Sequence, residues 1–181
     1  QARKSVLEYD DVMNTQRKII YEQRRQVLDG EDLQKSIASM MQYYVESYVT
    51  NAFAGQPHLE DRQAFFALMS HFENICFPKG AWIATDEELA SMDAAQMTDR
   101  ISDMLRKSYE KKEAQYGSPV MRELERVITL RVVDEYWMDH IDAMDDLRQG
   151  IRLRAYAQTD PVIEYKREGF DMFEAMTNAI K

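Results

Sequence analysis

The stretch SPVMRELERVITLRVVDEYWMDHIDAMDDLRQG, Ser118–Gly150, decides the fold that this sequence predicts. Ser118 suits the N-cap of a helix, and Pro119 suits the first helical position, where its missing N–H has no intrahelical partner in any case. No further Gly or Pro interrupts the chain until Gly150. We therefore expect one helix of about 30 residues, on the order of 45 Å long.

A second helix should follow closely, because Asp160 and Pro161 repeat the same start signal. Its apolar residues recur on one side, at Ile163, Phe170, Phe173, Met176 and Ile180. Two helices joined by a short connection form an antiparallel hairpin. Its tip would be LRQGIRLRAYAQTDP, Leu147–Pro161, which we call the tip segment.

The first helix is predicted to be apolar on two sides. One line recurs every seven residues, at Val6, Met13, Ile20 and Val27, and a second line consists of Leu7, Val12, Ile19 and Leu28. A helix that is apolar on two sides has two neighbours. We therefore interpret it as a scaffold helix, with the line Val6, Met13, Ile20 and Val27 as its face toward other domains.

The middle of the chain predicts a small helical subdomain. A broad apolar stripe starts at Leu33 and ends before Gly55, and a third helix is expected through Phe77. Thr85–Glu88 fits a capping box that opens a fourth helix, and a fifth should end near Gly117. The expected fold is all-α: a long first helix (1–29), a small helical subdomain (30–117), and an antiparallel two-helix hairpin (118–181).

Composition excludes some functions. The 181 residues carry a formal charge of −9, which argues against nucleic acid as a partner, because binding to phosphates needs an excess of Lys and Arg. The longest apolar run, Ala64–Met69, is far shorter than the roughly 20 residues that span a bilayer. The lone Cys76 lies in an apolar stretch and is interpreted as a small buried side chain. Because the chain begins at Gln1 without an initiator Met, we expect it to be part of a larger protein.

Two segments could carry chemistry. Asp139, His140, Asp142, Asp145 and Asp146 have the helical spacing of a metal site, although the Glu-x-x-His pairs of di-metal bundles are missing. The metal-site hypothesis predicts an all-α metal-dependent enzyme.

The tip segment is the other candidate. Ile151, Leu153 and Ala155 alternate with Arg152, Arg154 and Tyr156, and we predict that this alternation lies outside any helix. It is either a strand-like connector packed under the hairpin or a contact surface, since Tyr and Arg are enriched at interfaces. The spacing does not identify a partner.

Two long stretches resemble the SecA family, the ATP-driven motor subunits of bacterial preprotein translocase. They are VLEYDDVMNTQRKIIYEQRRQVL, Val6–Leu28, and DEYWMDHIDAMDDLRQGIRLRAYAQTDPVIEYKREGFDMF, Asp134–Phe173. The segment between them, about residues 31–117, is a weaker match and is placed by its position. The resemblance implies the helical scaffold and wing region of such a protein.

The resemblance also implies a role for the tip segment. In the family the two-helix finger enters the cytoplasmic mouth of the SecY channel and touches the unfolded preprotein through a fingertip tyrosine. That position is Tyr156 here, and Arg152, Leu153 and Arg154 are its expected neighbours in the contact. Family members often have Gly before this tyrosine, whereas this chain has Ala155, which predicts a stiffer tip.

The other implied partners are the nucleotide-binding and preprotein cross-linking domains. The family implies that this region restrains the ATPase of the motor, and that it acts in the bacterial cytoplasm, peripherally at the inner face of the cell membrane. ATP and zinc bind in other domains of the family, so we expect no cofactor and no catalysis in this chain itself. The alternatives are the metal-dependent enzyme and a plain helical adaptor.

Overall fold

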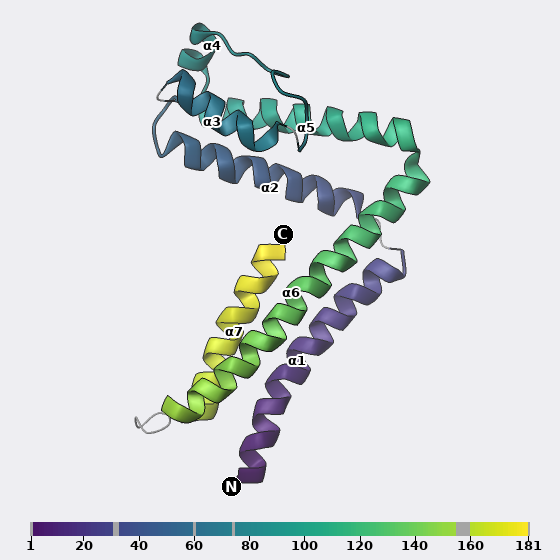
Figure 1. Ribbon diagram of the computed structural model, residues 1–181, viewed down its shortest axis with the longest axis vertical. Coiled ribbons are helices and arrows are strands. Elements are labelled where there is room, and N and C mark those ends of the chain that lie inside the picture. Colours follow the sequence, from purple (N-terminus) through teal and green to yellow (C-terminus); the bar gives the residue numbers. More distant parts are fainter. Residues whose placement is uncertain (1, 31–32, 60, 74, 155–159, 181) are drawn as a thin grey trace. The chain divides into compact units, whose positions relative to one another are not determined.

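The computed structural model describes residues 2–30, 33–59, 61–73, 75–154 and 160–180. For residues 2–5 and 152–154 it describes the backbone alone. The described residues form helices joined by short connections (Figure 1), and within these ranges the only extended pairing is an isolated bridge between Glu73 and Phe77. The all-α prediction is confirmed. The helices are α1 (Ala2–Leu28), α2 (Gln34–Phe53), α3 (Arg62–Phe72), α4 (Asp86–Ser91), α5 (Ala94–Tyr116), α6 (Ser118–Arg154) and α7 (Pro161–Ile180).

The chain divides into two compact units. One consists of Gln1–Asp32 and Leu124–Lys181 and contains α1, most of α6, and α7; we call it the three-helix unit. The other, Leu33–Glu123, contains α2 to α5 and the first turns of α6; we call it the four-helix unit. No helix in the described ranges has a stretch long and apolar enough to cross a bilayer.

The four-helix unit has its own apolar core. Helices α2 and α5 lie side by side and antiparallel, and α3 also packs against α2 (Figure 1). The predicted capping box is confirmed, because the Thr85 hydroxyl accepts from the Glu88 N–H and the Glu88 carboxylate accepts from the Thr85 N–H. The buried side chains include Val45, Val49, Phe53, Phe65, Leu68, Phe72, Trp82, Leu89, Met97 and Ile101.

Helix α3 ends earlier than the sequence predicts. Its last residue is Phe72, and Glu73 has extended backbone angles (φ −64°, ψ 143°), so the expected continuation to Phe77 is wrong. Phe77 precedes Pro78, whose ring disfavours the helical conformation of the residue before it. Cys76, in this irregular stretch, is half-buried, and burial raises the pKa of its thiol, which disfavours the reactive thiolate.

The three-helix unit is built on the predicted hairpin. Helix α6 runs antiparallel to α7 and to α1 (Figure 1). Two apolar clusters each take side chains from all three helices. One cluster consists of Tyr9, Met144, Ile151, Val162 and Tyr165, and the other of Ile20, Val133, Trp137 and Met176.

Helix α6 does not stop at Gly150. It continues to Arg154, so Ile151–Arg154 are helical and the expected alternation outside a helix is wrong for them. The reason is packing: Met144, Leu147 and Ile151 follow helical spacing into one cluster, and this outweighs the roughly 1 kcal/mol that Gly costs a helix relative to Ala. The start of α7 is as predicted, because the Asp160 carboxylate accepts from the Val162 N–H at 2.9 Å.

Candidate functional site

The tip segment is only partly described by the structure. Tyr156 and Ala155 lie outside the described residues, which resume at Asp160. Arg152, Leu153 and Arg154 form the last turn of α6, and only their backbone is described. The structure therefore places the base of the candidate contact surface at the adjoining ends of α6 and α7, where the antiparallel hairpin turns.

The base of the tip is closely packed. Ile151 is 2% exposed and Tyr165 is 1% exposed, and both contact the same cluster as Tyr9 of α1. The rings of Tyr9 and Tyr165 meet edge to face, with centroids 4.9 Å apart. Ile151, which the sequence assigned to a possible strand-like connector, is thus a helical core residue.

A charged pair lies beside this cluster. The Arg148 Nη1 donates to Asp10 Oδ1 at 3.1 Å, and the guanidinium lies 5.3 Å from the centroid of the Tyr9 ring. Arg148 therefore contacts α1 through both an ion pair and a cation–π interaction. Sequence reasoning did not pair Asp10 with Arg148, because 138 residues separate them.

A buried polar network lies deeper between the helices. The Gln16 side chain of α1 donates through Nε2 to the Gly169 carbonyl of α7 at 3.0 Å, and its Oε1 is 2.7 Å from His140 Nε2 of α6. Because Oε1 can only accept, His140 must donate through Nε2. Burial lowers the pKa of His140, so the neutral ring is favoured. Gly169 also lets Met144 of α6 pack close to α7, since a Cβ there would lie 2.7 Å from Met144 Cε.

The proposed metal ligands do not converge. Asp139, Asp142, Asp145 and Asp146 are exposed, whereas His140 is buried and bonded to Gln16. Across the described part of the chain, no group of three or more His, Cys, Asp or Glu side chains is placed to hold a metal ion. The helical spacing that suggested the cluster puts His140 on the core side of α6 and the aspartates on other sides.

The two apolar lines of α1 differ in their surroundings. Ile20 and Val27 are buried and Met13 is half-buried, while Val6 at the N-terminal end of the line is 40% exposed. Ile20 and Met13 pack against α6 and α7 within the three-helix unit. These two residues therefore do not form a face toward other domains, and that expectation is corrected for them.

The second line is the exposed one. Leu7, Ile19 and Leu28 are exposed, and Val12 is half-buried. A groove of about 470 Å³ runs between α1 and α7 beside this line. It is lined by Asp11, Val12, Thr15, Gln16 and Ile19 of α1 and by Lys166, Phe170 and Phe173 of α7.

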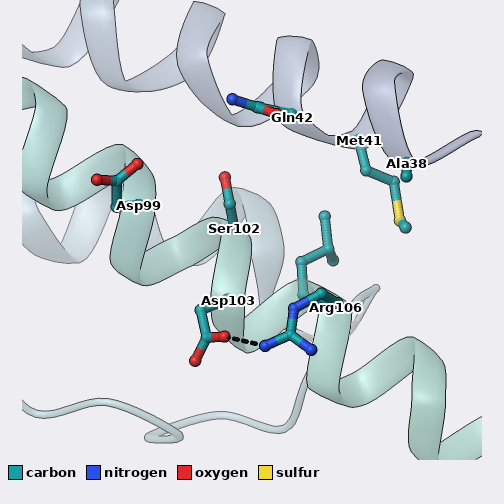
Figure 2. A pocket seen from close by; sticks show the side chains of 8 residues that line it. Ala38, Met41, Gln42, Asp99, Ser102, Asp103 and Arg106 are labelled. Atoms are coloured by element: carbon teal, nitrogen blue, oxygen red, sulfur yellow. Dashed lines mark hydrogen bonds and ion pairs between the residues drawn. The ribbon is translucent and has the colours of Figure 1, made fainter. Parts of the chain in front are cut away.

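The four-helix unit has a groove of its own. Its volume is about 330 Å³. Figure 2 shows its lining side chains, with Ser102 pointing from α5 toward α2. Arg106 on its α5 side is already paired with Asp103 and with Glu110, the latter at 2.7 Å. Hydrogen bonds from Lys107 and Arg106 lower the pKa of Asp103. Arg106 and Asp103 are therefore already paired within α5.

Comparison with known proteins agrees with this architecture. Residues 1–181 match the family described as the SecA Wing and Scaffold domain. The chain is 48% identical over 179 residues to a protein translocase subunit SecA of Acetivibrio thermocellus, 49% identical to SecA 1 of Clostridioides difficile, and 46% identical to SecA of Clostridium acetobutylicum. Each match covers 99% of this chain but only 20%, 19% and 21% of the respective relative.

The chain thus spans about a fifth of the length of these relatives, and the similarity extends through both units. The helices that form the hairpin and its packing against α1 lie within the matched range. This chain belongs to the SecA wing and scaffold domain family.

Proposed function

We propose that this chain is the wing and scaffold region of a protein-translocation motor. In this proposal α1 and α7 pack against the motor domains, and the α6–α7 hairpin presents Tyr156 to the translocating polypeptide. The observation that carries the proposal is the exposed apolar line of α1, on a helix whose other line is buried in its own unit at Ile20 and Val27. The names of the relatives give the context, since each is called a protein translocase subunit.

The exposed line supports docking for an energetic reason. Leu7 and Ile19 on α1, and Ile163 and Phe170 on α7, are between 43% and 64% exposed. Complete burial of one such side chain contributes about 1.5–3 kcal/mol relative to full exposure. These side chains are already partly buried, so a partner that covers this face and fills the groove between α1 and α7 would gain several contributions of about half this size.

The hairpin suits contact with varied sequences. Its base is fixed by core residues of three helices, so a side chain at the tip is carried on a stiff support. A tyrosine supplies a large aromatic area at little rotamer cost, and aromatic area does not require a fixed hydrogen-bond partner. Arg152, Leu153 and Arg154 are the proposed neighbours of Tyr156 in this contact.

The proposed partners are the nucleotide-binding and preprotein cross-linking domains of the same protein, the SecY channel and an unfolded preprotein. ATP hydrolysis belongs to those other domains, and this region restrains it when no channel is bound. The proposal places the protein in the bacterial cytoplasm, peripherally at the inner face of the cell membrane.

The test is transport by a full-length SecA that carries this sequence in its wing and scaffold region. Tyr156→Phe should transport at close to the parent rate, because the ring remains. Tyr156→Ala should lose most transport with little change in melting temperature. In vitro translocation of a preprotein into membrane vesicles measures the rate.

Tyr43→Ala is the matched control, since Tyr43 on α2 is 64% exposed and has no role in the proposal. It should transport as the parent does. Parent-like transport by Tyr156→Ala, or a collapse of its melting temperature, would show that Tyr156 does not act as a fingertip.

A further inference from the structure

The end of the hairpin is attached to α1 by side chains that the proposed tip contact does not use. Arg148 reaches Asp10 at 3.1 Å and lies over the Tyr9 ring, and Tyr9 packs edge to face on Tyr165 of α7. One short stretch of α1 therefore contacts both arms of the hairpin near its turn. The side chains of Arg148 and Asp10 are 26% and 49% exposed, so the pair is partly shielded from water.

A second charged pair joins α1 to α6 farther from the tip. The Arg24 Nη2 donates to Asp134 Oδ2 at 3.1 Å, and the Arg24 Nε lies 2.8 Å from Asp134 Oδ1 as an ion pair. Arg24 lies 14 positions after Asp10, and Asp134 lies 14 positions before Arg148. Along a helix 14 residues rise about 21 Å. The two pairs therefore lie along one antiparallel contact, one near the tip and one remote from it.

We propose that the Asp10–Arg148 pair is a positioning pair for the tip, through which α1 sets where the tip is held. This inference rests on the proposed function of the tip. Arg24–Asp134 joins the same two helices but has no such role, because it is remote from the hairpin turn.

The physical reason is the short distance along the chain from the pair to the tip. Arg148 is six residues before the last residue of α6, and only residues 155–160 link α6 to α7. The ends of the two helices therefore determine the volume that the tip can reach. Loss of the Asp10–Arg148 pair removes one of the contacts that hold the end of α6 on α1 beside the apolar cluster, and so lowers the effective concentration of the tip at its target.

The experiment compares Asp10→Asn with the matched variant Asp134→Asn in full-length SecA. Each removes one carboxylate from one pair between α1 and α6. Nitroxide labels at Lys18→Cys and Gln158→Cys, in a background without other cysteines, report the distance between α1 and the tip by electron–electron resonance. Transport rate and melting temperature are measured for the unlabelled variants.

Asp10→Asn should broaden the distance distribution and slow transport at least about threefold, whereas Asp134→Asn should retain the parent distribution and rate. Asp10→Glu, which keeps the charge, should behave as the parent. The two asparagine variants should lower the melting temperature by similar small amounts, since both pairs are partly exposed.

Three results would overturn the inference. An unchanged distance distribution in Asp10→Asn would show that the pair does not hold the tip. A broadened distribution with unchanged transport would show that the position of the tip does not matter. Equal effects of Asp10→Asn and Asp134→Asn would indicate a general loss of stability. Failure of the proposed function is recognised separately, because it requires parent-like transport by Tyr156→Ala.

Discussion

At the scale of single residues, the sequence predicts on which face of α6 His140 lies, but it does not predict the partner of its side chain. Val133, Trp137, His140, Met144 and Ile151 recur at helical spacing on α6, so the sequence already places His140 on the apolar line rather than among the aspartates. Its partner Gln16 is 124 residues away. A single sequence holds no local signal for such a pair, so the metal-site hypothesis was wrong about the use of this histidine.

The buried imidazole predicts a specific dependence of stability on pH. Burial lowers the pKa of His140 below its unfolded value of about 6.5, so below that pH the unfolded state binds more protons than the folded state. The stabilising effect of the neutral ring is complete above about pH 6.5 and is lost as pH falls through the lower pKa of the folded state. The free energy of unfolding, from urea denaturation between pH 8 and 5, should therefore fall more steeply in the parent than in His140→Gln.

His140→Gln should be less stable than the parent at pH 8, because it loses the packing of the ring against Trp137 and Phe173. Other titrating groups are common to both proteins and cancel in the comparison. Parallel pH profiles would show that His140 is not held neutral by burial.

At the scale of helices, the positions of charged residues on α1 and α6 favour the antiparallel arrangement of these two helices. Each helix carries an aspartate 14 residues before an arginine, and Asp10 and Arg24 on α1 face Arg148 and Asp134 on α6. The antiparallel arrangement pairs opposite charges at both places, whereas a parallel one would set Asp10 against Asp134 and Arg24 against Arg148. The equal 14-residue spacing is visible in the sequence, and it was the available signal for this register that sequence reasoning missed.

The sequence predicted which segments are helical better than it predicted where the helices end. The capping box at Thr85 and the Asp160–Pro161 start are local signals, and both were read correctly. Gly150 was read as an end because glycine often follows a helix, but tertiary packing of Leu147 and Ile151 carries the helix through it. Local signals predict a helix terminus only where packing does not override them.

The continuous α6 predicts the effect of a substitution. At Gly150 an added Cβ meets nothing within 4 Å, and the backbone is helical, so Gly150→Ala should raise the free energy of unfolding by up to about 1 kcal/mol. Urea denaturation followed by circular dichroism measures it.

Gly117→Ala is the matched control, because Gly117 has a φ of +86° that a residue with a Cβ adopts only with strain. It should lower the free energy of unfolding. A neutral or destabilising Gly150→Ala would contradict the helical packing through that position.

At the scale of the whole molecule, the sequence predicted which segments are helical, but it did not predict which face of α1 packs within the chain. The long first helix, the helical middle and the hairpin follow from glycine and proline positions and from apolar periodicity, and the structure contains each of them. The choice between the two apolar lines of α1 could not be predicted, because both have similar residues. Only the packing of Ile20 against Val133 and Trp137 shows which line is used within the chain.

The central claim is that the exposed face of the three-helix unit docks on motor domains and restrains them. Titration of this chain against the nucleotide-binding and preprotein cross-linking domains of the same SecA, purified without it, tests the claim most directly. Calorimetry should detect binding, and the ATPase turnover of those domains should fall as the chain is added. Ile19→Ala should weaken binding about tenfold, equivalent to about 1.4 kcal/mol, because Ile19 contributes apolar area to the groove.

Lys18→Ala should bind as the parent does, since Lys18 is the exposed neighbour of Ile19 and does not line the groove. The account predicts saturable binding with reduced turnover and a loss of affinity confined to Ile19→Ala. Absence of binding, or turnover that stays unchanged at saturating concentrations of the chain, would contradict it.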